Sequence, residues 1–217
     1  MIALICSGGP STLLCSLERF LNRRDVIFIG ADQGAQTLYE QGIIPDVMIG
    51  DFDSIQSDAL QKLESIVPRI IRANVEKDET DTDLALQYAL TMHPTEIILT
   101  CVSGGRLDHE EAAKRSLLRV QLDNPTISCK ILSKRNSIQY FTQPNRTYTF
   151  ESDYKYVSFF AVNESIKGVT IKHVKYETNL APLPFTSSRF TSNELVAAQG
   201  ELYFTNGICM MMTSVDE

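Results

Sequence analysis

Four aspartates stand where they could together hold a divalent cation. Asp51 and Asp53 are two residues apart directly after an apolar run, and residues two apart on an extended chain point the same way. Asp78 and Asp81 belong to a second acidic run, residues 76–83, which has five acids in eight residues. Carboxylate oxygens without a neighbouring histidine favour magnesium over zinc. The alternatives are a capped turn for the first pair and a solvated acidic surface for the second.

The charge of these acids bears on the choice between the alternatives. Helix capping explains one or two acids of the second run, because acids favour the positive end of a helix. Two like charges ~4 Å apart repel by about 4 kcal/mol at an effective dielectric constant of about 20. If the two pairs converge, a bound cation is the simplest way to offset this repulsion.

Glycine-rich turns and one arginine could bind the phosphates of a nucleotide. Gly8 and Gly9 follow the first apolar run and could let backbone N–H groups approach a phosphate, although a tight turn explains them equally well. Asp32 follows the second run and could bind a ribose or cap a helix. After a later glycine pair, Arg106 could clamp phosphate oxygens. Asp108 could orient a ribose, a metal-bound water or Arg106, or could cap a helix.

Taken together, these residues describe phosphoryl-type transfer, in which positioning and charge neutralisation supply most of the catalysis. The sequence has no GxxxxGK[ST] loop, which excludes a Walker-type enzyme. No GxGxxG motif stands at the first turn, which argues against a dinucleotide-dependent oxidoreductase.

The elements that must position these residues alternate through the first part of the chain. Apolar runs rich in Ile, Val and Leu indicate strands buried on both faces, and helical periodicity separates them. Strict alternation predicts a doubly wound, mostly parallel α/β sheet of the Rossmann type, in which ligands bind at the carboxyl ends of the strands. The expected strands are 2–6, 26–30, 47–49, 69–72, 97–102 and 127–132, and the expected helices are 12–21, 35–41, 57–66, 82–92 and 110–121.

The later part of the chain has no helical periodicity and predicts a small antiparallel β-sandwich. We place the boundary between residues 134 and 135, which gives an α/β domain over 1–134 and a sandwich over 135–217. Asn206-Gly207 between two strand-like runs indicates a hairpin. Residues 179–185, with two prolines, are a mobile loop or an edge segment. The expected strands are 137–141, 148–151, 156–161, 168–176, 195–198, 201–204 and 208–213.

Composition narrows the class of protein. A net charge of −7 gives no general attraction to nucleic acid or to anionic membranes. No apolar run approaches the roughly 20 residues of a spanning helix, and the apolar N-terminus is read as a strand rather than a signal peptide. Five cysteines without a CxxC motif fit buried free thiols in a reducing cytoplasm.

In this order, the motifs resemble the thiamine pyrophosphokinase (thiamine diphosphokinase) family. The resemblance covers nearly the whole chain. It rests on Ala31-Asp32-x-Gly34-Ala35, Pro45-Asp46-x-x-x-Gly50-Asp51-Phe52-Asp53-Ser54, Asp78-Glu79-Thr80-Asp81, Gly104-Gly105-Arg106-Leu107-Asp108-His109, Ser187-Ser188 and Thr191-Ser192-Asn193-Glu194.

The resemblance implies a homodimeric enzyme that moves a pyrophosphoryl group from ATP to the hydroxyl of thiamine and leaves AMP. Its sites would form between subunits, with an N-terminal catalytic, nucleotide-binding domain and a C-terminal thiamine-binding domain. The roles carried over are magnesium ligation by Asp51, Asp53 and Asp81, a nearby catalytic position for Asp78, phosphate or substrate contact by Lys77, nucleotide contact by Arg106 and Asp108, and pyrimidine contact by Ser192 and Asn193.

Two rival functions stay open on the sequence. One is a pyrophosphokinase for another hydroxymethyl heterocycle, such as a pterin; the late motif over 191–194 speaks for thiamine instead. The other is a non-catalytic nucleotide or thiamine sensor, which would have little need for so many metal ligands.

Overall fold

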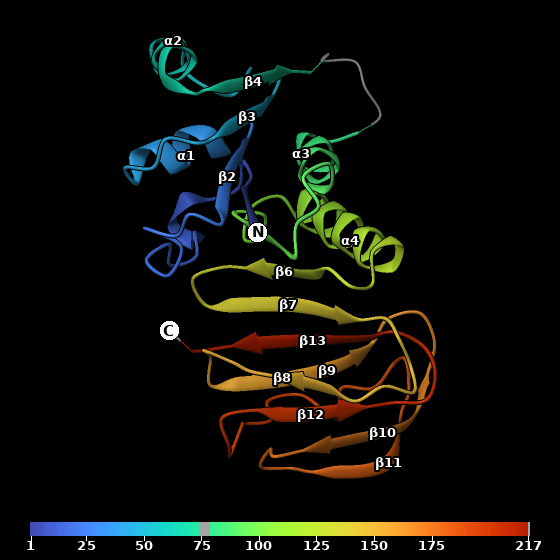
Figure 1. Cartoon of the computed structure of the whole chain (residues 1–217). Helices are drawn as coiled ribbons and strands as arrows, with labels where there is room; N and C mark the ends of the chain where they lie inside the picture. The colour runs from blue at the N-terminus through green and yellow to red at the C-terminus, as the bar shows by residue number, and fades with distance from the viewer. Residues whose placement is uncertain (74–78, 217) are drawn as a thin grey trace. The chain divides into compact units, whose positions relative to one another are not determined.

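A computed structural model of the chain describes residues 1–73 and 79–216 (Figure 1). The chain divides into two compact units, Met1–Lys134 and Arg135–Glu217. Two of the predicted site residues, Lys77 and Asp78, lie outside the described residues.

Parallel strands form the sheet of the first unit. β1 lies at its centre between β2 and β5, and all five of its residues are buried. This burial explains why β1 is apolar throughout, since helices cover both faces of such a sheet. The order within the unit is β4-β3-β2-β1-β5-β6. The strands are β1 (Ile2–Cys6), β2 (Val26–Ala31), β3 (Val47–Gly50), β4 (Arg69–Arg72), β5 (Glu96–Thr100) and β6 (Ser128–Leu132).

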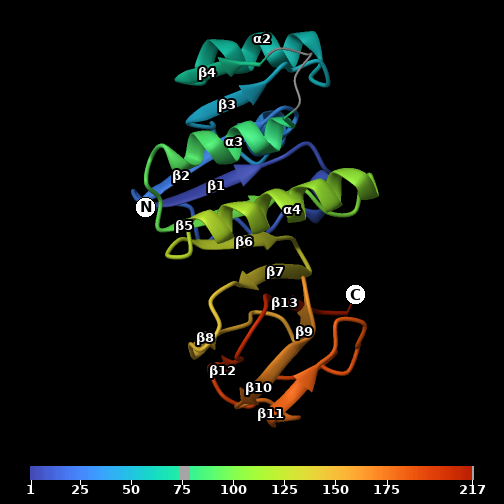
Figure 2. The same cartoon turned by 90° about the vertical axis from the view of Figure 1, so that its right-hand side faces the viewer.

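Helices cover the two faces of this sheet in pairs. In Figure 1, α1 and α2 lie on one face and α3 and α4 on the other, and Figure 2 shows α3 and α4 in front of the strands. The direction of winding reverses between β1 and β5, so the loops after these strands diverge and leave room for a ligand. The predicted doubly wound fold is confirmed. The helices are a 3₁₀ turn η1 (Ser11–Leu13), α1 (Gly34–Glu40), α2 (Ser57–Ile66), α3 (Asp81–Leu90) and α4 (Leu107–Asp123).

A capping box fixes the start of α3. The Thr80 hydroxyl accepts from Asp83 N at 3.1 Å, and the Asp83 carboxylate accepts from Thr80 N at 3.2 Å. The other carboxylate oxygen of Asp83 accepts from Ser116 Oγ at 2.6 Å and from Arg119 Nη2 at 2.8 Å. Asp83 is therefore a structural acid that joins α3 to α4, which separates it from the remaining acids of the run.

Replacing Asp83 with Asn should lower the free energy of unfolding by about 2 kcal/mol, because the new amide group cannot accept from all these donors. Denaturant unfolding measures the loss. The control is Asp123→Asn at the exposed end of α4, which should change stability little. Equal losses in the two variants would contradict the role of the network.

The same carboxylate should make stability depend on pH. Burial alone would raise the pKa of Asp83, but hydrogen bonds from Ser116 and Thr80 and the charge of Arg119 outweigh it, so the pKa lies below its ordinary value. A carboxyl whose pKa is lower in the folded chain than in the unfolded one, where it is about 3.9, stabilises at neutral pH. That stabilisation is lost as the pH falls through the depressed folded pKa. The stability gap between wild type and Asp83→Asn should therefore close in acid.

The helix predicted over 12–21 is wrong. Only η1 forms, and it ends at Leu14, whose N–H donates to Ser11 O at 3.0 Å. The neighbouring backbone groups bond to distant parts of the unit: Leu13 O accepts from Lys134 N at 3.0 Å, and Cys15 N donates to Thr100 Oγ1 at 3.2 Å. Tertiary hydrogen bonds have thus overridden the local helical pattern.

No helix among the described residues is long and apolar enough to cross a membrane.

The second unit is an antiparallel sandwich, as predicted. One sheet has the order β7-β13-β9 and the other β11-β10-β12-β8. Their inner faces share one core, which includes Phe150 from one sheet and Phe159 from the other, with ring centroids 5.3 Å apart. The strands are β7 (Asn136–Phe141), β8 (Tyr148–Phe150), β9 (Tyr156–Ala161), β10 (Ile166–Lys172), β11 (Thr178–Leu183), β12 (Gly200–Tyr203) and β13 (Cys209–Ser214).

Two predictions for this unit are wrong and one alternative is decided. Asn206-Gly207 does not close a hairpin, because β12 pairs with β10 and β8 whereas β13 pairs with β7 and β9. Asn206 instead lies in the connection from β12 to β13, which belong to different sheets, and its side-chain oxygen accepts a hydrogen bond from Lys167 N at 2.8 Å. Residues 195–198 form no strand; Leu195 makes a single bridge to Val174. The segment with two prolines overlaps β11, an edge strand that includes Pro182, and proline is tolerated at a sheet edge.

Candidate active site

A cavity of about 700 Å³ opens at the carboxyl ends of the parallel strands of the first unit. The loop after β1 lines it with Ser7, Gly8 and Gly9, and the loop after β2 lines it with Asp32. The loop after β5 and the start of α4 contribute Arg106, His109 and their neighbours, while the start of α3 contributes Asp81. The cavity lies at the reversal of winding between β1 and β5, where ligands bind in this fold class.

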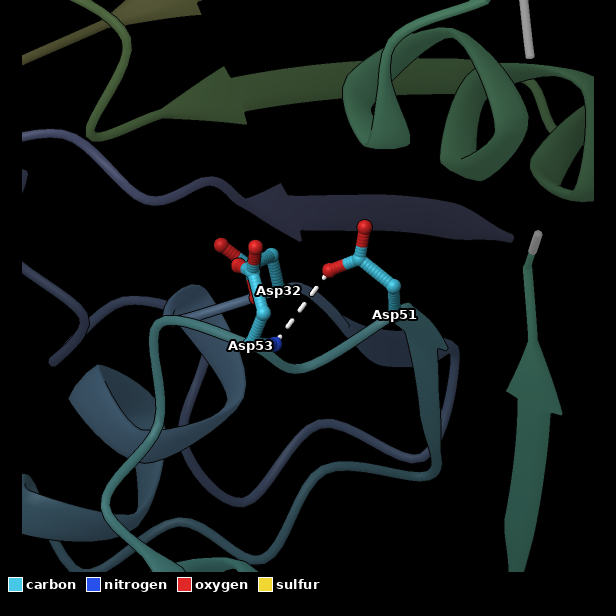
Figure 3. Close-up of side chains that lie close together, drawn as sticks. All are labelled: Asp32, Asp51 and Asp53. Carbon is cyan, nitrogen blue, oxygen red and sulfur yellow. Dashed lines mark hydrogen bonds between the residues drawn. The ribbon is translucent and has the colours of Figure 1, made fainter. Parts of the chain in front are cut away.

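Three carboxylates converge beside this cavity. One oxygen from each of Asp32, Asp51 and Asp53 lies within 4.8 Å of the others. Figure 3 shows the three side chains rising from two adjacent loops into one space. Asp32 follows β2, and the other two follow β3; these strands are neighbours in the sheet. The adjacency of two strand ends therefore creates the cluster.

The backbone of both loops takes conformations that residues with side chains rarely adopt. Asp32 has φ +50 and Phe52 has φ +63, both in the left-handed region. Phe52 is 2% exposed and packs in a core cluster with Met48 and Leu63. The buried Phe52 side chain fixes the turn between Asp51 and Asp53. Within this turn, Asp53 N donates to Asp51 Oδ1 at 3.2 Å. Packing of Phe52 thus offsets the cost of the turn, which is of order 1–3 kcal/mol.

Two hydrogen bonds hold Asp32 in place, but they use only one of its two carboxylate oxygens. Its backbone N–H donates to Ile49 O at 2.8 Å, and its Oδ2 accepts from Ser54 Oγ at 2.6 Å. Its Oδ1 is buried and has no hydrogen-bond partner among the residues that the structure describes. A buried carboxylate oxygen without a partner is costly unless a cation or donor binds it.

The donor set fits a hard divalent cation. It offers only carboxylate oxygens, on three side chains, and leaves positions for waters and phosphate oxygens, as magnesium requires. A cation would also remove the mutual repulsion of the three charges. Asp32 Oδ1 is buried and has no partner within residues 1–73 and 79–216, and this distinguishes the cluster from an ordinary acidic surface.

The structure distributes the predicted metal ligands differently from the sequence prediction. Asp51 and Asp53 lie together as expected, and Asp32, which we assigned to the nucleotide, joins them. Asp81 is the first residue of α3 and lines the same cavity as Asp32, but its carboxylate is not part of the group of three. The position of Asp32 at the end of a strand next to β3 could have indicated its place.

The glycine loop after β1 is packed directly against the loop after β5. Gly9 N donates to Cys101 O at 2.8 Å, and a Cβ on Gly9 would lie 2.3 Å from that oxygen. Position 8, by comparison, has room for a side chain, because a Cβ on Gly8 would meet nothing closer than 3.7 Å. Ser7, which the sequence did not single out, shares a hydrogen bond of 2.9 Å with Thr82 on α3. Only glycine fits at position 9, and the loop is rigidly placed.

Arg106 and Asp108 form an exposed pair at the start of α4. Arg106 donates to both carboxylate oxygens, at 3.1 and 2.6 Å. These hydrogen bonds hold the pKa of Asp108 at about 2. Asp108 Oδ1 also accepts from His109 N at 3.0 Å. The pair fixes the guanidinium at the rim of the cavity, where a phosphate could displace the carboxylate.

The two predicted thiamine contacts lie in the second unit and differ in character. Ser192 is exposed and has φ +58. Its backbone N–H donates to Ser158 Oγ at 2.9 Å. Asn193 is 2% exposed. Its side chain accepts from Tyr176 N at 2.9 Å and donates to Tyr176 O at 2.9 Å. The Asn193 side chain therefore organises the loop that presents Ser192.

Comparison with known proteins adds the family to this geometry. A family model described as "Thiamin pyrophosphokinase, catalytic domain" matches residues 17–129, and one described as "Thiamin pyrophosphokinase, vitamin B1 binding domain" matches residues 146–209. The chain is 35% identical to thiamine pyrophosphokinase of Bacillus subtilis (strain 168) over 214 residues, which are 98% of each chain.

Solved structures agree with the sequence matches. The crystal structure of thiamine pyrophosphokinase from Bacillus subtilis has a TM-score of 0.90 and 32% identity, with 100% of both chains covered. That of thiamin pyrophosphokinase from Geobacillus thermodenitrificans has a TM-score of 0.87 and 36% identity, with 100% of this chain and 99% of the other covered. On the match of both halves of the sequence and of the whole fold, the chain belongs to the thiamin pyrophosphokinase family.

Proposed function

We propose that the protein transfers a pyrophosphoryl group from ATP to the hydroxyl of thiamine, with magnesium, and releases AMP. The observation that carries the proposal is the group Asp32, Asp51 and Asp53 beside a glycine-lined cavity. One buried oxygen of the group has no hydrogen-bond partner in the part of the chain that the structure describes. The family membership supports both the reaction and the substrate. The hydroxyl of thiamine attacks the β-phosphorus of ATP, and AMP is the leaving group.

In this proposal Asp51 and Asp53 hold magnesium together with Asp32. Asp81 faces the same cavity and contributes from the start of α3, and Asp78 precedes it in the chain. Magnesium, when bound, would neutralise charge on the phosphates during transfer. The protein's own contribution is to fix the carboxylates before substrate arrives, through the anchored turn at Phe52 and the hydrogen bond from Ser54 to Asp32.

The nucleotide is proposed to occupy the cavity of the first unit, residues 1–134. Gly8 presents its backbone N–H to the phosphates, while Gly9, whose N–H donates to Cys101 O, holds the loop in place. Arg106 and Lys77 offset the charge of the phosphates. With its pKa at about 2, Asp108 is a weak proton acceptor near neutral pH. Its role is to orient Arg106 rather than to act as a base.

Replacing Arg106 with Ala should raise the KM for ATP about tenfold, which corresponds to the loss of about 1.4 kcal/mol, with a smaller change for thiamine. The same change should return the pKa of Asp108 from about 2 toward the ordinary value of about 3.9. Steady-state kinetics and a carboxyl NMR titration measure the two effects. Arg115→Ala is the control, because Arg115 pairs with Glu111 farther along α4. An unchanged Asp108 pKa would contradict the pairing.

The second unit, residues 135–217, is proposed to bind thiamine through the exposed loop that carries Ser192, which Asn193 supports. The match of this region to a vitamin B1 binding domain favours thiamine over a pterin.

The protein is further proposed to act in the cytoplasm as a homodimer. Exposed apolar side chains on this unit, Leu180, Phe185 and Val196 at 65%, 55% and 67%, suit a subunit interface. Sedimentation equilibrium at the mass of a monomer would exclude the dimer.

Product analysis tests the function. Incubation with ATP, thiamine and magnesium should give thiamine diphosphate and AMP by mass spectrometry, and a hydroxymethylpterin in place of thiamine should give no product. ADP as the nucleotide product would show single phosphoryl transfer. Tight binding of both ligands without turnover would favour a sensor.

A further inference from the structure

Two thiols that the proposed reaction does not use lie beneath the glycine loop of the cavity. Cys6 is the last residue of β1, and Cys101 comes directly after β5. In the parallel pairing of these strands, Cys6 stands opposite Thr100. Adjacent strands are about 4.8 Å apart and one residue advances the chain by about 3.3 Å. Cys101, one residue beyond Thr100, is therefore expected at a Cα–Cα separation of roughly 6 Å from Cys6, inside the range of about 4.4–6.8 Å that a disulfide spans.

The backbone at Cys101 departs from the regular conformation of a strand. Successive residues of a strand point to opposite faces, so a regular continuation of β5 would direct Cys101 away from Cys6. Instead, Cys101 has φ +54, in the left-handed region that favours glycine. A hydrogen bond between the thiols, reinforced by burial, raises the pKa of Cys6, and the same bond lowers the pKa of Cys101. Cys101 is therefore the more readily ionised of the two.

Access distinguishes Cys101 from the other cysteines. Cys6 is 0% and Cys101 2% exposed, yet Cys101 lines the cavity, through which a small reagent can reach it. Burial raises the pKa of both Cys129 and Cys209 to about 12, and neither lines the cavity. Thiolate character and access together decide which thiol reacts.

We propose that Cys6 and Cys101 form a reversible redox pair whose disulfide impairs nucleotide binding. With a peroxide as oxidant, the Cys101 thiolate attacks one peroxide oxygen, the O–O bond breaks, and hydroxide leaves and takes up a proton. The Cys6 sulfur then attacks the sulfur of the resulting sulfenic acid; the S–O bond breaks, and the thiol proton leaves with the hydroxyl as water. The peroxide gains two electrons, which come from the two thiols.

The glycine loop would transmit this bond to the nucleotide site. Gly9 N donates to Cys101 O at 2.8 Å, and the contact leaves no room for a Cβ on Gly9. Any adjustment of the Cys101 backbone that brings the two sulfurs to bonding geometry would therefore be passed to Gly9 through this oxygen. This consequence rests on the proposed function, since it assumes that the loop binds ATP phosphates; the formation of the disulfide does not.

The test treats the full-length protein with hydrogen peroxide, blocks remaining thiols, and maps linked peptides by mass spectrometry. In parallel, calorimetry measures binding of Mg·ATP to the reduced and the oxidised protein. The expected result is a peptide that links Cys6 to Cys101, at least about a tenfold loss of ATP affinity, and recovery with dithiothreitol. Cys6→Ala should abolish the loss, whereas the control Cys129→Ala should retain it. Cys101→Gly, which suits φ +54, serves as a second thiol-free variant.

The outcomes separate this proposal from the function itself. Absence of the Cys6–Cys101 link, or a link to Cys15 in its place, would overturn the redox pair. A link that leaves ATP affinity unchanged would overturn its effect on the loop. If the reduced protein binds no ATP, the proposed function fails, while peptide mapping still decides whether the pair forms.

Discussion

Asp51→Asn is expected to lower turnover by about 10²–10³-fold while the protein stays folded. The substitution keeps size and shape but removes one charge from the group in which Asp32, Asp51 and Asp53 place oxygens within 4.8 Å of one another. Two carboxylates would then hold magnesium more weakly, and the charge on the transferred group would be offset less well. Steady-state assay of AMP release across a magnesium titration measures the effect.

The matched control for this variant is Asp58→Asn. Asp58 is an exposed acid in the first turn of α2, seven residues farther along the chain. It should retain wild-type turnover, and both variants should unfold at the wild-type temperature. Wild-type turnover of Asp51→Asn at every magnesium concentration would mean that Asp51 is not a metal ligand.

Gly9→Ala is expected to have the second large effect, a loss of ATP affinity of at least about tenfold, or about 1.4 kcal/mol. The new Cβ would lie 2.3 Å from Cys101 O, which is backbone and cannot rotate away. Either the glycine loop or the turn after β5 must shift, and both line the cavity. Overpacking of this kind also costs about 1–3 kcal/mol of stability.

Gly8→Ala provides the comparison, because a Cβ there would meet nothing closer than 3.7 Å. Its effect should be clearly smaller in both calorimetric ATP binding and thermal unfolding. If the two variants behave alike, the tight contact between Gly9 and Cys101 does not control the loop.

The strands of the first unit were predictable because each is a short apolar run with sharp limits. β1 is predicted at its observed bounds, residues 2–6, since buried parallel strands tolerate few polar residues. The segment 12–21 has a helical pattern that fails, because Leu13 and Cys15 find hydrogen-bond partners more than 80 residues away, at Lys134 and Thr100. Such partners are invisible to periodicity.

The site was predictable where strand ends bring residues together, and not where a turn's conformation decides. Asp51 and Asp53 follow from two-residue spacing after β3. Its position at a strand end is a signal for Asp32, but its place in the group also depends on its φ of +50 and on the pairing of β2 with β3, and residue spacing gives neither of these. Likewise, Asn193 matches a motif but is used inside its own unit, where its amide bonds to Tyr176. A motif identifies a residue without showing which way its side chain is engaged.

Anomalous diffraction from crystals with Mn²⁺ and a non-hydrolysable ATP analogue would show directly whether the group Asp32, Asp51 and Asp53 binds the metal. Manganese replaces magnesium at oxygen sites and can be located by its own signal. We expect a peak within about 2.5 Å of carboxylate oxygens from Asp51 and Asp53, adjacent to Asp32 Oδ1 and to the analogue's phosphates. A metal bound to the phosphates alone, with none of these three carboxylates in contact, would contradict it.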